Sequence, residues 1–245
     1  MRFALALSLL AALLSGCASH SDRNPDGIWI NQVAIDAAVK GGNLRQALLA
    51  NGPNLEWRVD SKTGQASFSN GFEQSEGKIT SAADGKFHID FYGNFFEDLT
   101  IKGDDLIQAA SESGPEQRFQ QPKDPASADA PPGSSFEKAL YNAYMGGKWK
   151  IVDGVGAGSI VQFHPDGSVD GLPGNDRYAL CLAGDCAAMS GENDSLWLEK
   201  NKQGNAWIFY RKGDQLEILQ AVNQAQSDEM PDLHPGARQW LLQRD

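Results

Sequence analysis

Short apolar runs separated by turn residues constrain this chain more than any other feature. Between residues 26 and 121, and again between 136 and 245, runs rich in aromatic and β-branched side chains alternate with turns rich in Gly, Asn and Asp. This pattern is typical of antiparallel sheets. In one run Phe87, Ile89 and Phe91 alternate with polar residues, so one face of that strand meets a core. We expect a mostly β protein with short helices, built from small antiparallel barrels or curved sheets.

A break in this pattern divides the chain. Residues 122–135 read PKDPASADAPPGSS, with four prolines and no large apolar residue. Such a stretch cannot bury enough surface to fold and is typical of a linker. The sequence therefore predicts a first β-rich domain over 26–121, a flexible linker over 122–135 and a second β-rich domain over 136–245.

Helices are expected near the start of each half. Residues 34–49 read as one or two short helices, and Asn43 is a candidate cap for the second. In the second half, Ser134 and Glu137 have the spacing of a capping box. Three apolar residues then share one helical face: Phe136, Leu140 and Tyr144. We expect this helix to end at Gly146-Gly147.

The two halves also resemble each other. Gly27-Ile28-Trp29 and Gly147-Lys148-Trp149 each place a Trp two residues after a Gly, near the start of a half. Each half also ends in a comparable pair of predicted strands. A tandem structural repeat is one interpretation, and the chance recurrence of short turn motifs is the alternative.

Cys181 and Cys186 form an even pair separated by four residues. This spacing suits a structural disulfide across a tight hairpin, which would add only about 2 kcal/mol in the chain-entropy model. A redox-active pair is the alternative, although such pairs usually have two residues between the sulfurs.

Charge and residue types exclude several functions. The formal net charge is −11, so the long-range field repels nucleic acid. The histidines are scattered and none belongs to a cluster with metal-ligand spacing: His20, His88, His164 and His234. The sequence therefore predicts no metal, no cofactor and no catalytic constellation.

The first 17 residues resemble the signal of bacterial lipoproteins. Arg2 precedes an apolar run from Phe3 to Leu14, which is shorter than the roughly 20 residues that span a bilayer. The run leads into Leu14-Ser15-Gly16-Cys17, which looks like a lipobox. An ordinary secretory signal with a Cys at its cleavage site is the alternative.

The lipoprotein resemblance has consequences for location. It implies that residues 1–16 are removed, that Cys17 is lipidated and that residues 17–25 form a short tether to a membrane. Because Ala18 and Ser19 follow the Cys, similarity to sorting in Gram-negative bacteria implies the outer membrane, with the protein facing the periplasm.

Two further resemblances concern the β-rich halves. The run Gly171 to Tyr178 follows a strand-like Val161-Gln162-Phe163 and a turn at Asp166-Gly167, an order similar to that of the META-domain family of envelope proteins. The two Gly-x-Trp segments resemble those that close one end of lipocalin-like barrels. Three residues of the first run are candidates for ligand or partner binding: Asn175, Arg177 and Tyr178.

Together these features favour a membrane-anchored, non-catalytic envelope module. It would bind a small apolar ligand, a lipid or an envelope protein partner. The alternative is an envelope hydrolase with an active site near residues 171–186.

Overall fold

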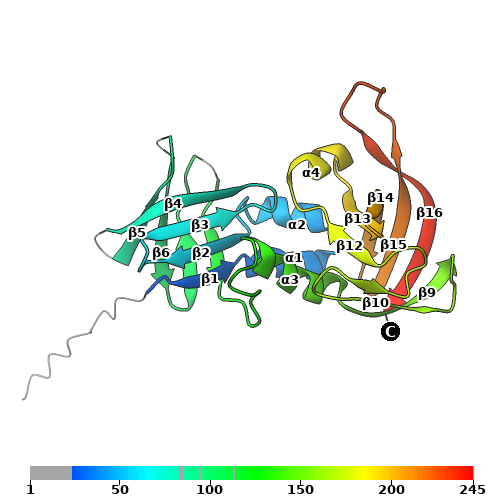
Figure 1. Cartoon of the computed structure of the whole chain (residues 1–245), viewed down its shortest axis with the longest axis horizontal. Coiled ribbons are helices and arrows are strands. Elements are labelled where there is room, and N and C mark those ends of the chain that lie inside the picture. The colour runs from blue at the N-terminus through cyan, green and yellow to red at the C-terminus, as the bar shows by residue number, and fades with distance from the viewer. Residues whose placement is uncertain (1–23, 83–84, 94, 113, 245) are drawn as a thin grey trace, which may run out of the picture.

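The computed structural model describes residues 24–82, 85–93, 95–112 and 114–244. Cys17 and the whole signal segment lie outside these residues. Two eight-stranded antiparallel sheets lie on either side of three helices, α1 (Gln32–Gly41), α2 (Leu44–Ala50) and α3 (Ser134–Leu140) (Figure 1). The expected mostly β class with two tandem barrel-like sheets is confirmed. None of the described helices combines the length and apolarity needed to cross a membrane.

The first sheet is a closed barrel in which each strand pairs with the next and the last pairs with the first. Its strands are β1 (Gly27–Ile30), β2 (Glu56–Asp60), β3 (Gln65–Ser69), β4 (Gln74–Ser81), β5 (Lys86–Asp90), β6 (Phe96–Lys102), β7 (Asp105–Gln108) and β8 (Gln117–Gln120). Strand β4 lacks the alternation of apolar and polar residues that predicts a strand. It is nearly all polar, and only Gly77 within it is buried.

Aromatic and aliphatic side chains fill the barrel. The Phe68 ring contacts those of Trp57 and Phe91, with centroids 5.3 Å apart in both pairs. Ile89 is fully buried, and Phe87 and Phe91 pack against the same core. The predicted core face of this strand is therefore confirmed.

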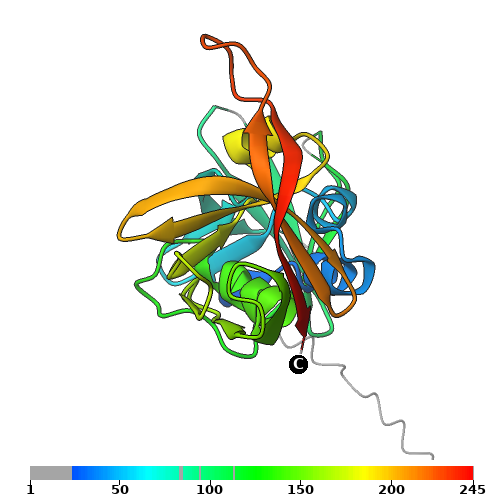
Figure 2. The same cartoon turned by 90° about the vertical axis from the view of Figure 1, so that its right-hand side faces the viewer.

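The second sheet has the order β11-β10-β9-β16-β15-β14-β13-β12. Its strands are β9 (Gly147–Gly154), β10 (Ile160–Phe163), β11 (Val169–Asp170), β12 (Arg177–Leu180), β13 (Asp194–Lys200), β14 (Gln203–Lys212), β15 (Gln215–Asn223) and β16 (Leu233–Arg244). Its edges meet at a bridge between Ser168 and Arg177. The hairpin of β15 and β16 extends beyond the rest of the sheet (Figure 2). One more helix, α4 (Gly184–Ser190), joins β12 to β13.

Helix α2 begins where the sequence predicts, and helix α1 begins at Gln32, two residues before the expected start. The Ala34 N–H donates to the side chain of Asn31, and the Gln46 N–H donates to that of Asn43 at 2.7 Å. Asn side chains are favourable N-caps because they satisfy backbone donors that lack helical partners. The predicted cap at Asn43 is confirmed.

Helix α3 is confirmed but its predicted capping box is wrong. The N-cap is Gly133, and Ser134 makes no capping hydrogen bond. Instead, the carboxylate of Glu56 in β2 accepts the N–H groups of Ser135 and Phe136, at 2.8 and 2.9 Å. A distant acid therefore takes the place of the local serine. The helix continues as a π-helical turn, η2 (Tyr141–Met145), and the three expected face residues are buried.

A carboxylate of the second sheet likewise caps a helix of the first half. Asp194 at the start of β13 accepts the N–H groups of Leu44 and Arg45 in α2, at 2.8 and 2.7 Å. At the end of α1, the Arg211 guanidinium donates to the carbonyl of Val39. The two halves thus satisfy each other's helix ends.

One apolar core spans both halves. It includes Ile35 of α1 and Leu48 of α2 together with Phe136 of α3 and Trp149 and Phe209 of the second sheet. A core shared in this way holds the helices of the first half against the second sheet.

The segment 122–135 lies against the first barrel. Arg58 donates to the carbonyls of Ala130 and Pro131, at 2.6 and 2.7 Å, and Gln74 donates to the carbonyl of Pro132. These contacts and the shared core contradict the expected flexible linker. The composition of segment 122–135 indicates that it does not fold alone. Its backbone carbonyls nevertheless accept hydrogen bonds from side chains of the neighbouring sheet.

The two Gly-x-Trp segments have the same local geometry. Gly27 and Gly147 both have positive φ, at 124° and 108°. The indole of Trp29 donates to the carbonyl of Pro25, four residues upstream, and that of Trp149 donates to Met145, also four residues upstream. Both bonds measure 2.8 Å. This equivalence supports the hypothesis of a structural repeat.

Candidate functional site

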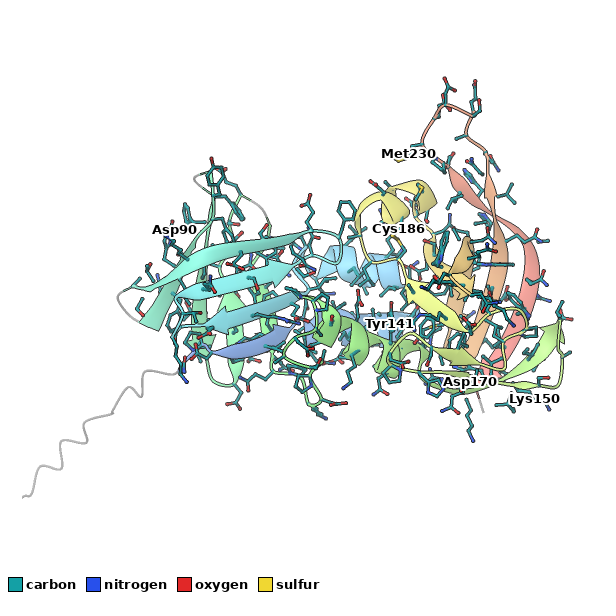
Figure 3. All side chains as sticks on the ribbon, in the orientation of Figure 1. Asp90, Tyr141, Lys150, Asp170, Cys186 and Met230 are labelled. Atoms are coloured by element: carbon teal, nitrogen blue, oxygen red, sulfur yellow. A yellow bond between two sulfur atoms is a disulfide. The ribbon has the colours of Figure 1, made fainter. Side chains whose placement is uncertain are left out.

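Residues 181–190 connect β12 to β13, contain a disulfide and face α2. We call this segment the disulfide-linked corner. Cys181 follows β12 and is bonded to Cys186 in α4, which Figure 3 labels. The predicted disulfide is confirmed, but the predicted hairpin is wrong because Gly184 begins a helix. The Ser190 hydroxyl, in α4, donates to the hydroxyl of Ser195 in β13. Both ends of the corner are therefore attached to the sheet.

A groove of about 450 Å³ lies between α2 and this corner. Its lining comes from α2 and the turn after it, from loops of the first barrel, and from the corner. The apolar members are Leu48, Leu49, Pro53, Leu55, Pro115, Leu182, Ala183, Ala187 and Ala188. A volume of this size lies in the range of small-molecule sites.

The groove is open at its rim and apolar at its base. Leu55 and Leu182 are buried, whereas Leu49 is 71% exposed. Nearby, the ring of Phe72 lies against Gly184 and is 57% exposed. Large apolar side chains grouped at one opening are typical of a binding surface.

The groove carries one charge. Arg45, in the first turn of α2, is the single charged residue among the described residues that line it. Asn70, from the first barrel, is the other lining residue with a polar side chain. The rest of the surface offers hydrophobic contact and no acid–base group.

A second cavity, of about 510 Å³, lies where α3 and η2 meet the turn after β10. Its lining includes Glu137, Lys138 and Tyr141, the last of which Figure 3 labels. Desolvation and then the charge of Glu56 raise the pKa of Glu137. Lys138 forms an ion pair with Asp124 at 2.7 Å. Lys138 also donates to the carbonyl of Pro125, so it holds segment 122–135 to α3.

The residues proposed from sequence lie at the closed edge of the second sheet. Tyr178 is buried, donates its hydroxyl to the carbonyl of His164 and contacts the ring of Tyr141, with centroids 4.9 Å apart. Asn175 donates to the carbonyl of Pro173 within its own turn. Arg177 is exposed and donates to the carbonyl of Asp166. None of the three lines the groove.

The region proposed for a hydrolase contains no Ser or His between residues 171 and 186. The nearest such side chains have other partners: the Ser168 hydroxyl donates to Asp166, and His164 pairs with Asp170 at 2.9 Å. Across the described ranges, no group of His, Cys, Asp or Glu has the arrangement of a metal site. The hydrolase hypothesis stays a prediction.

His88 makes stability depend on pH. Its ring lies 2.7 Å from Asp98 and 3.2 Å from Asp90, and the hydrogen bond with Asp98 is the main cause of its raised pKa. The stabilisation is therefore fully present below pH 6.5 and is lost as pH rises through the folded-state pKa. His88→Gln should lower the melting temperature at pH 5.5 and leave it unchanged at pH 8.5, with an effect below about 1 kcal/mol for so exposed a pair. A deficit that grows with pH would contradict this assignment.

The groove was missed from sequence because its two sides are more than 100 residues apart. Leu48 and Leu49 were recognised as helical, but α4 was not predicted at all. Adjacent leucines on a short helix were the one available signal, since only one of them, Leu48, is buried by the fold.

Comparison with known proteins gives no relative: no family model, no curated protein and no solved structure matches this chain.

Proposed function

We propose that this protein is a membrane-anchored binding module of the bacterial envelope. In this proposal Cys17 carries the lipid and the described residues form a non-catalytic body at the outer membrane. The groove between α2 and the disulfide-linked corner binds an apolar ligand or an apolar segment of a partner.

The exposed Leu49 carries the proposal. A leucine that is 71% exposed beside a groove lined by other leucines and alanines retains apolar surface that folding did not bury. Covering such surface contributes roughly 25 cal/mol per Å². The disulfide and the Ser190–Ser195 hydrogen bond hold the opposite side of the groove in place. A pre-formed apolar site of this kind needs little reorganisation to bind.

Substitution at the rim tests the proposal. Full-length wild type, Leu49→Glu and Val155→Glu are purified from membranes in mild detergent, and retained lipids, small molecules and proteins are identified by mass spectrometry. Val155 is 54% exposed in the β9–β10 loop and serves as the matched control. We expect a bound species with wild type and Val155→Glu and at least tenfold less with Leu49→Glu. Equal retention by all three would contradict the proposal.

A further inference from the structure

Arg45 differs from the other arginines that the structure describes. Each of the others uses its guanidinium in a hydrogen bond or ion pair: Arg58, Arg118, Arg177, Arg211, Arg238 and Arg244. Within the described ranges no such partner of the Arg45 guanidinium is found. It lines the groove instead, one helical turn from Leu48 and Leu49.

Asp194 interacts with Arg45 without an ion pair to its guanidinium among the described residues. Asp194 attracts Arg45 electrostatically. However, its two carboxylate oxygens already accept the backbone N–H groups of Leu44 and Arg45. Neither oxygen accepts a hydrogen bond from the Arg45 guanidinium in the part of the chain that the structure describes, so this side chain keeps its donors for a further anion. Arginine is suited to this because its planar guanidinium binds a carboxylate through two parallel hydrogen bonds.

The charged and the apolar parts of the groove follow each other along α2. Arg45 lies at the start of α2, Leu48 and Leu49 follow, and Gly52-Pro53 lies beyond the end of the helix. Seven helical residues span about 10 Å. A ligand that lies along α2 therefore meets a cation at one end and an apolar channel over the rest of its length.

We propose that the groove binds a single fatty acid, with its carboxylate on Arg45 and its acyl chain between α2 and α4. This rests on the proposed function and names the ligand. A volume of about 450 Å³ suits one chain rather than the two chains of a phospholipid. The net charge of −11 repels an anion at long range, so binding depends on the local contact with Arg45.

Photolabelling tests the ligand in the full-length protein reconstituted in nanodiscs. The probes are photoactivatable analogues of dodecanoate and dodecanol, and labelled peptides are mapped by mass spectrometry. We expect dodecanoate to label α2 and α4 and to be displaced by unlabelled fatty acids, with affinity rising about fourfold per methylene from eight to twelve carbons. Arg45→Gln should reduce dodecanoate labelling at least tenfold and spare dodecanol, and Arg45→Lys should restore part of it. Arg238→Gln, which removes an exposed arginine of the second sheet, should change neither.

Other outcomes separate the two proposals. If dodecanol labels the groove as well as dodecanoate and Arg45→Gln has no effect, the fatty-acid assignment is overturned and apolar binding stands. If neither probe labels the groove but a protein or a phospholipid depends on Leu49 for copurification, the assignment is again overturned and the binding module stands. If neither probe labels the groove and nothing copurifies, both proposals fail.

Discussion

Glu56→Ala should lower the free energy of unfolding by about 3–5 kcal/mol, the range expected when one member of a buried charged network is removed. Glu56 is fully buried, and its carboxylate accepts the Ser135 and Phe136 N–H groups of α3 and the Arg58 guanidinium. Alanine would leave two helical donors without acceptors, each costing about 1–3 kcal/mol. Urea denaturation of the full chain followed by far-UV circular dichroism measures the loss.

Glu56→Gln is the matched control for this prediction. Both α3 donors share one carboxylate oxygen of Glu56, so the glutamine carbonyl oxygen can accept both, but its amide group then faces the Arg58 guanidinium with donors of its own. We expect Glu56→Gln to lower the free energy of unfolding by less than Glu56→Ala does. A loss below about 1 kcal/mol for Glu56→Ala would show that the cap contributes little to the attachment of α3.

Local patterns were sufficient for most strands and for the start of α2. Alternation at Phe87, Ile89 and Phe91 predicted the core face of β5, because side chains of a strand alternate between faces whatever the rest of the fold does. Asn43 was identified as a cap because its partner, the Gln46 N–H, is only three residues away. Both interactions lie within a few residues of chain.

Interactions between the halves could not be predicted from such patterns. Ser134 has the right spacing for a capping box, yet Glu56 provides the acceptor for Ser135, and no local rule connects two residues separated by 79 positions in the chain. Composition alone predicts a flexible segment over 122–135. Its order depends on Arg58 and Gln74, which belong to strands of the other half.

The candidate site also depends on tertiary contacts that local sequence patterns do not show. The run from Gly171 to Tyr178 attracted interest because polar and aromatic residues gather in it, and the structure uses Tyr178 and Asn175 for internal contacts. The groove combines Leu49 with Ala188, and no pattern in the sequence connects these two positions. Its chemistry is produced by tertiary packing of ordinary residues.

Trp149→Ala tests whether the shared core makes the two halves one cooperative unit. Trp149 is fully buried, donates to the carbonyl of Met145 and lies under the guanidinium of Arg244, 4.6 Å from the ring. Removing a buried Trp side chain costs roughly 3–5 kcal/mol, and a desolvated cation–π contact adds about 2. Because the core joins Trp149 to α1 and α2, the loss should also reach the first half.

Hydrogen exchange measured by mass spectrometry resolves where that loss appears. We expect Trp149→Ala to speed exchange in β9 and β16 and also in α1, α2 and the adjoining end of β2, where Glu56 caps α3. Trp197→Ala is the control, since Trp197 is 45% exposed on the outer face of β13 and its removal should cost less than about 1 kcal/mol. Faster exchange confined to the second sheet would mean that the halves unfold independently. In that case the groove, whose sides come from both halves, would open without global unfolding, and ligand binding would restore protection in α2 and α4 together.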